Sequence, residues 1–180
     1  MEIPSTFSVS DSISFEGAIE LTQSLLQEVE QRRVPEPELE RIITALVQSE
    51  NGARGFFVTY LSDDREFIDQ ILPTVVSALL KSEETVGDLL AKNLAMSTGM
   101  ILTHTRNQNP QMAAGSARVQ RRTEAIIKQM QSSKVDQHLD QLKTTIETGT
   151  GEYQRFLERW KYDAEQKAAM LEAIKSALST

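Results

Sequence analysis

Apolar residues recur along most of the chain at intervals of three and four positions, which is the period of one face of an α-helix. The first such segment covers residues 14–33 and ends at Val34-Pro35, because proline disfavours helical geometry in the residue before it. A second helix follows and is predicted to end at the turn signal Asn51-Gly52. The stripe of the first helix contains Phe15, Ile19, Thr22, Leu26 and Val29, and that of the second contains Leu39, Ile42, Ile43, Leu46 and Val47.

Residues 55–61, with the sequence Gly-Phe-Phe-Val-Thr-Tyr-Leu, do not follow a clear period. Their β-branched and aromatic content favours a strand. The rest of the chain offers no second strand, however, and a lone strand would leave its backbone groups unpaired. The segment is therefore predicted to be a short buried helix.

Capping signals divide the region that follows. Asp63 with Glu66 three positions later resembles a capping box and predicts a helix that ends near Ile71. Pro73 is favoured at the first position of a helix and predicts another. A third helix is predicted over residues 82–105, because two acidic residues in its first turn interact favourably with the helix dipole.

The remainder of the chain has few helix breakers. Residues 110–148 predict one long helix or two helices hinged at Ser132-Ser133. The last segment predicts one helix with an allowed break at Asp163. Its apolar positions begin with Tyr153, Phe156, Leu157 and Trp160.

These segments predict an all-α fold, in which a multi-helix N-terminal body over 15–106 is followed by a long antiparallel helical hairpin over 110–179. The first residues, 1–14, are rich in serine and are predicted to form a flexible arm. Body and hairpin are expected to pack as one domain. The hairpin's apolar stripe between Met112 and Met130 is thin for a freestanding pair of helices, and such stripes are often completed by a partner helix.

The amino-acid composition excludes several kinds of site. The chain has 180 residues, of which 39% are hydrophobic and 25% charged, as is ordinary for a soluble protein. The absence of cysteine excludes disulfides, zinc ribbons, iron–sulfur clusters and thiol catalysis, and it fits a reducing compartment. No apolar run reaches the length of a membrane span, and the N-terminus lacks the pattern of a secretory signal. We therefore expect a cytoplasmic protein that does not insert into membranes.

The sequence contains no motif that carries a chemistry by itself. The phosphate-binding, dinucleotide-binding, nucleophile-elbow and zinc-protease motifs are all absent. His104 and His138 are the only histidines, and neither follows a glutamate at the spacing that di-iron bundles use. His138 is expected to be an exposed helix residue, and His104 to have a capping or packing role at a helix end. We expect no cofactor and no metal.

Charge is distributed unevenly. Residues 1–90 contain 6 Lys or Arg and 17 Asp or Glu, whereas residues 91–180 contain 13 and 9. The basic excess is strongest near Arg118, Arg121 and Arg122, which lie beside the apolar stripe of their predicted helix. They are predicted to form a basic ridge on an otherwise acidic protein.

Three interpretations of this ridge remain open. It can pair with the acidic half, within the chain or across a homodimer; it can bind an acidic partner protein; or it can contact phosphates of nucleic acid or lipid. The net charge of −7 disfavours the last, because long-range repulsion opposes the encounter.

The favoured function is a non-enzymatic protein–protein interaction module, of adaptor or regulatory type, or a homo-oligomer. Its candidate binding residues are Arg118, Arg121 and Arg122, with Arg106 and His104 nearby in sequence. The alternative is a helical protein that binds a small molecule or anion in a pocket formed by Arg54, Tyr60, His104 and Arg106. A nucleic-acid-associated factor comes third. An enzyme is less favoured, because no arrangement of acid–base residues points to one.

Overall fold

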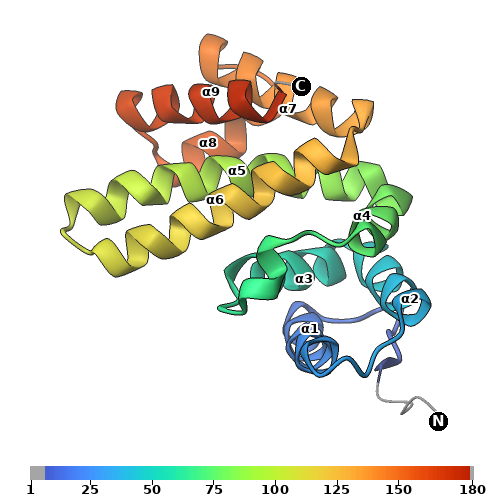
Figure 1. Cartoon of the computed structure of the whole chain (residues 1–180). Coiled ribbons are helices and arrows are strands. Elements are labelled where there is room, and N and C mark those ends of the chain that lie inside the picture. Colours follow the sequence, from blue (N-terminus) through green and yellow to red (C-terminus); the bar gives the residue numbers. More distant parts are fainter. Residues whose placement is uncertain (1–6, 179–180) are drawn as a thin grey trace. The chain divides into compact units, whose positions relative to one another are not determined.

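The structure is a computed structural model, and it describes residues 7–178. Every regular element among these residues is a helix, which confirms the predicted all-α class (Figure 1). None of the helices in this part of the chain combines the length and the apolar character that crossing a membrane requires. The predicted flexible arm lies partly on residues 1–6, outside the described residues. Within its remainder, Phe7 is buried, and its carbonyl oxygen accepts a hydrogen bond from Arg41 Nη2 at 3.3 Å.

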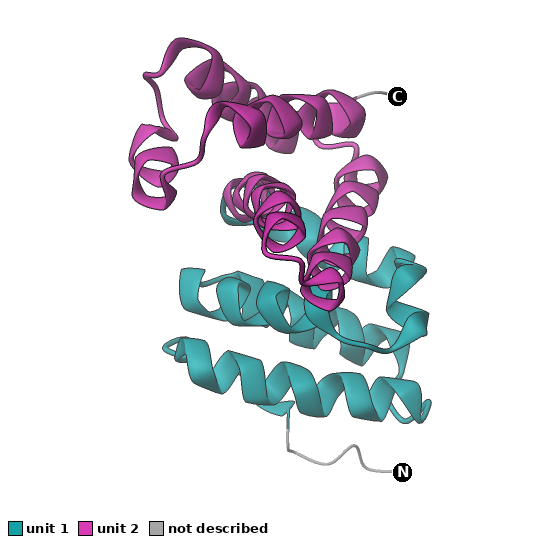
Figure 2. Cartoon of the chain, turned by 90° about the vertical axis from the view of Figure 1, so that its left-hand side faces the viewer, with its two compact units in different colours: residues 1–86 teal, residues 87–180 magenta. Residues whose placement is uncertain are grey.

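The chain divides into two compact units, residues 1–86 and residues 87–180 (Figure 2). The division falls inside a long helix, α5, rather than at the loop near residue 108 where the sequence suggested it. Packing of the two parts as one domain stays a prediction.

The first unit is built from short helices. Helix α1 begins after Ser14, whose Oγ accepts a hydrogen bond from the Gly17 N–H at 3.0 Å. In the core, the Phe56 ring stacks on Tyr60 with 5.1 Å between centroids. The elements are α1 (Phe15–Glu30), α2 (Glu36–Val47), α3 (Glu50–Ser62), the 3-10 helix η2 (Glu66–Asp69), α4 (Pro73–Leu79) and the 3-10 helix η3 (Leu80–Ser82).

Helices α1 and α3 cross at small residues. A Cβ added at Gly55 would lie 2.4 Å from the Ala18 Cβ and 2.8 Å from the Phe15 carbonyl oxygen. Only glycine permits this approach, because any side chain would force the two backbones apart. The crossing brings the aromatic side chains of α3 into the core of the unit.

Two local predictions in the first unit are wrong, and one is confirmed. Residues 55–61 are helical, as predicted. Asn51-Gly52 does not end a helix but lies in the first turn of α3, because Ser49 Oγ caps that helix at the Gly52 N–H. The helix predicted from Asp63 to Ile71 is reduced to the short η2, since the Asp63 carboxylate binds the N–H and guanidinium of Arg65 instead of capping a longer helix.

The second unit consists of longer helices. Helix α5 (Glu83–Arg106) enters it from the first unit, and α6 (Pro110–Met130) returns beside α5 (Figure 1). Gln120 Nε2 donates to Thr98 Oγ1 at 2.9 Å and links this pair. The unit ends with α7 (Ser133–Thr148), α8 (Gln154–Trp160) and α9 (Ala164–Leu178).

The predicted hinge and break in this region are both confirmed. Gln131 adopts the left-handed conformation after α6, and Ser132 caps α7 by accepting the Val135 N–H. Lys161 ends α8 in the same conformation, before α9 starts at Ala164. The described part of this region, residues 110–178, thus contains four helices, and its description as one long hairpin is not confirmed.

Candidate functional site

The three arginines of the predicted ridge lie on α6 but differ in exposure. Arg121 is exposed, Arg118 is half-buried, and Arg122 is only 2% exposed. Arg118 and Arg122 already interact with other groups of the chain. A 100° step between neighbouring helix positions turns Arg122 away from the exposed face that Arg121 occupies. Of the three, Arg121 alone is fully accessible to a partner.

Arg106, at the end of α5, is engaged by two carboxylates of the second unit. Its Nη1 lies 2.6 Å from Asp163 Oδ2, and its Nη2 contacts Glu165. The hydrogen bond from the Arg106 guanidinium lowers the pKa of the Asp163 carboxyl. His104 is half-buried in the last turn of the same helix, where its carbonyl oxygen accepts the Asn109 N–H. The capping or packing role expected for the His104 side chain stays a prediction.

A polar network that includes the buried Gln166 adjoins Arg106. Asp163 Oδ1 accepts the Gln166 N–H, and Gln166 Oε1 accepts the Asp163 N–H, which forms a reciprocal cap at the start of α9. The Gln166 amide then donates to the Gly99 carbonyl oxygen and to Thr103 Oγ1, both at 3.0 Å. The network joins α9 to α5. Its polar groups satisfy one another's hydrogen bonds.

Arg54 and Tyr60 are engaged within the first unit. The Arg54 guanidinium lies 5.0 Å from the centroid of the Phe15 ring, and Tyr60 is buried. The cavity beside Tyr60 is apolar and has a volume of about 10 Å³, which is too small for a ligand. The predicted pocket that joins this pair to His104 and Arg106 stays a prediction, since the two pairs belong to different units.

The expected exposure of His138 is wrong, because this residue is only 9% exposed. Its Nδ1 lies 2.9 Å from the Tyr153 hydroxyl, and a Cβ added at Gly87 would lie 2.8 Å from its ring. His138 shares the buried face of α7 with Val135, Leu139 and Leu142. The i, i+3, i+4, i+7 spacing of these four residues indicates that His138 lies on the buried face of its helix. The two aspartates that flank His138 favoured the wrong expectation that it is exposed.

Sequence reasoning also missed a polar groove between α7 and α8. The groove has a volume of about 1030 Å³. Its charged lining residues are Asp136, Asp140, Glu152, Arg155 and Glu158. Within residues 7–178, no group of three or more histidine or acidic side chains is placed to hold a metal ion. The acidic groove is therefore an open surface feature without a built metal site.

Two partly apolar surfaces are exposed on the second unit. The first, which we call the hairpin end, comprises the exposed Met112 and the half-buried apolar residues on the connected halves of α5 and α6: Met100, Ile101, Leu102 and Val119. The second is at Trp160, which the sequence placed on the apolar face of its helix. Trp160 is instead 47% exposed, because α8 stops there at a left-handed Lys161 and the chain turns away.

Comparison with known proteins identifies a family. No curated protein matches the chain, and no solved structure matches it either. Residues 14–177 match the family described as "Uncharacterised conserved protein UCP020893", and the chain belongs to this family.

Proposed function

We propose that this chain is a non-enzymatic protein–protein interaction module, of adaptor or regulatory type, and that a partner protein binds at the hairpin end. The observation that carries the proposal is the exposure of Met112, which is 52%. This residue continues an apolar stripe whose other end is fully covered. A contiguous exposed apolar patch is typical of interaction sites, and Met112 with the neighbouring half-buried apolar residues is the candidate for one.

The stripe on α6 changes from buried to exposed along one helix face. Met130 and Ile126 are buried, Val119 is half-buried, and Met112 is exposed. These positions lie on the same side of a 3.6-residue helix. The sequence thus specifies an apolar face longer than the part the second unit covers, and a partner helix would complete it.

Helix α5 shows the same change toward the same end. Leu94 and Ala95 are buried, whereas Met100, Ile101 and Leu102 are only half-buried. Because α5 and α6 run side by side and are joined by a short loop, these half-buried positions lie toward the same end of the helix pair as Met112 (Figure 1).

Arg121 belongs to a different face of α6. Nine positions separate it from Met112, which places the two side chains about 180° apart on the helix. A partner at the hairpin end would therefore not contact Arg121, and a partner of the predicted basic ridge would not contact Met112. The two versions of the interaction hypothesis can be separated by single substitutions.

The alternative of an anion-binding pocket has weaker support, because both of its arginines are engaged. Two carboxylates hold Arg106, and Arg54 lies over the Phe15 ring. An anion would have to displace these contacts. No observation on the described residues favours catalysis over binding.

The proposal can be tested by site-specific photocrosslinking. A photoreactive amino acid at Met112 should capture one partner protein in the native lysate, whereas the same group at the exposed Lys143 of α7 should not. The captured protein, once purified, is then titrated against wild type and variants by calorimetry.

Met112→Glu should weaken that binding about tenfold or more, because a charge replaces an apolar anchor. Arg121→Glu is the matched control on the opposite face and should leave the affinity nearly unchanged. Equal crosslinking at Met112 and Lys143, or equal affinities of wild type and Met112→Glu, would refute the hairpin end as the site. If only Arg121→Glu abolished binding, the partner would bind at the basic ridge and not at the hairpin end.

A further inference from the structure

The surface around Trp160 combines an exposed aromatic ring with positive charge. Trp160 is the only tryptophan of the chain, and the Arg159 guanidinium lies 5.7 Å from the centroid of its ring. Arg155, one turn earlier on α8, and Lys161 are also exposed. Tryptophan and arginine are the residues most enriched among the anchors of protein interfaces. We call these four residues the tryptophan surface.

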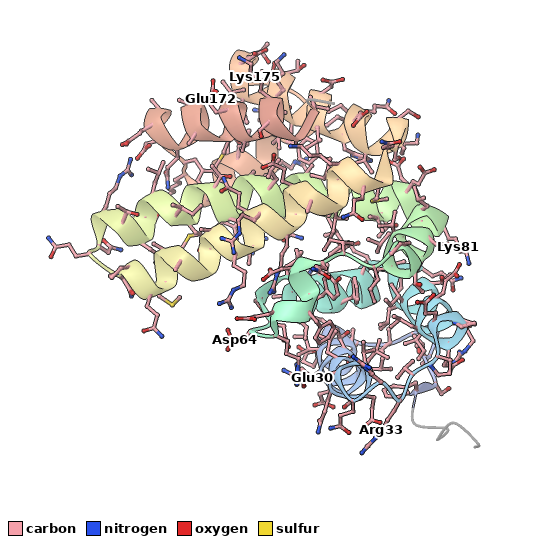
Figure 3. The ribbon with its side chains drawn as sticks, viewed as in Figure 1. Glu30, Arg33, Asp64, Lys81, Glu172 and Lys175 are labelled. Atoms are coloured by element: carbon pink, nitrogen blue, oxygen red, sulfur yellow. The ribbon has the colours of Figure 1, made fainter. Side chains whose placement is uncertain are left out.

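The first unit carries a groove of complementary character along α1. The groove has a volume of about 590 Å³. Phe7, Gly17 and Leu21 contribute its apolar part, and Glu20 and Glu28 contribute carboxylates. One further lining residue, Arg33, lies beyond the carboxyl end of α1, where its side chain points to solvent (Figure 3). Its guanidinium lies 3.5 Å from Glu28. We call this feature the α1 groove.

The charges of the two units are opposite. Residues 1–86 contain 6 Lys or Arg and 16 Asp or Glu, whereas residues 87–180 contain 13 and 10, so the net charges are −10 and +3. Complementary charge steers association and fixes its orientation. A second copy of this chain offers the acidic surface that the tryptophan surface requires.

We propose that the chain self-associates, with Trp160 of one copy in the α1 groove of a second copy. The indole would cover Leu21 and the neighbouring apolar atoms, while Arg155 and Arg159 would face Glu20 and Glu28. A groove of 590 Å³ has room for an indole together with a guanidinium. The contact joins two different surfaces. Two copies therefore either form a second, reciprocal contact and make a closed dimer, or bind further copies and make larger assemblies.

Other anionic partners fit this surface less well. The net charge of −7 opposes approach to nucleic acid or to an anionic membrane. Helix α8 has seven residues, which is short for a helix that lies on a lipid surface. The proposed contact is also separate from the hairpin end, so it holds or fails independently of the proposed function.

The experiment uses the full chain and measures mass and tryptophan emission together. Sedimentation velocity over a micromolar concentration series should show wild type shifting from monomer to a larger species. Because Trp160 is the only tryptophan, its emission reports on the contact directly and should shift to shorter wavelength over the same series. High salt should weaken both changes.

Charge reversal provides the specific test. Arg159→Glu and Glu20→Arg should each weaken self-association about tenfold or more, and the double variant should regain most of it because the pair is restored in reverse. Lys143→Glu, the same charge change elsewhere on the second unit, should have no such effect.

The proposal is overturned if wild type stays monomeric across the series. It is equally overturned if the chain associates while the Trp160 emission stays unchanged. A third contrary outcome is a double variant whose self-association is weakened by the two single effects combined. Circular dichroism of each variant confirms that these exposed substitutions leave the helices intact.

Discussion

The two units hold their helices together by different means. Among the described residues, the first unit buries three polar side chains and the second buries eight. In the first unit, the buried hydroxyls of Thr22 and Thr59 bond to carbonyl oxygens of their own helices and not to a neighbouring helix. In the second unit, Gln166 and His138 bond to other elements. The comparison indicates that shape specifies the first core, whereas hydrogen-bond partners help to specify the second.

The largest effect is expected at the close crossing of the first unit. Gly55→Ala should destabilise the protein by about 2 kcal/mol or more, because the new Cβ would overlap the Ala18 Cβ and the Phe15 carbonyl oxygen. Chemical denaturation measures the change in the free energy of unfolding.

Gly115→Ala is the matched control, since a Cβ there meets nothing within 4 Å. This substitution in the second turn of α6 should stabilise the protein by about 0.5–1 kcal/mol through helix propensity. If both variants behaved alike, close approach would not be what sets the α1–α3 crossing.

The next effect tests the polar core of the second unit. Gln166→Leu should cost about 1–3 kcal/mol, because the buried Gln166 amide would lose its hydrogen bonds to the Gly99 carbonyl oxygen, to Thr103 Oγ1 and to the Asp163 N–H. Thermal unfolding measures it. The same substitution at the exposed Gln129 of α6 should change stability by less than about 0.5 kcal/mol. A Gln166→Leu variant as stable as wild type would show that the network is dispensable.

A smaller effect compares two threonines of the first unit. Thr44 Oγ1 is buried and has no hydrogen-bond partner among the described residues, whereas Thr22 Oγ1 donates to the Ala18 carbonyl oxygen at 2.7 Å. Thr44→Val should therefore stabilise the protein by about 1 kcal/mol, since an unpaired hydroxyl is removed from a buried place. Thr22→Val should destabilise it. Denaturant midpoints of the two variants on opposite sides of wild type would support this assignment, and midpoints shifted in the same direction would contradict it.

The smallest effect concerns the exposed ion pair of the second unit. Arg106 lowers the pKa of Asp163 below its unfolded value, so the pair stabilises the fold above the unfolded pKa of about 4 and loses this contribution as pH falls through the lower, folded value. The pKa of Asp163, followed by NMR, should rise toward about 4 in Arg106→Gln. The acid-induced fall in melting temperature should also be slightly smaller in Asp163→Asn than in wild type. An unchanged pKa in Arg106→Gln would exclude the pair as the cause.

Local signals in the sequence predicted most of the helices correctly. Ser14 and Ser132 lie directly before helices, and their side chains accept the N–H groups of Gly17 and Val135. The sequence also predicted the hinge at Ser132 and the break at Asp163. Such contacts span three or four residues, so periodicity and capping preferences contain the information.

The candidate site was predicted less well, because exposure depends on residues far away in the sequence. Arg121 and Arg122 are neighbours of the same type, yet one is exposed and the other buried. Trp160 counted as an apolar stripe position, but the end of α8 leaves it half in solvent. No periodic pattern shows which part of an apolar stripe another helix covers.

The sequence by itself determined that this protein is all-α, where most of its helices begin and end, and that its two halves differ in charge. These properties follow from composition and from interactions between residues close along the chain. Only the tertiary structure decided that His138 and Arg122 are buried and that Met112 and Trp160 are exposed. The physical reason is that burial is set by the element that packs against a residue, and that element comes from a distant part of the sequence.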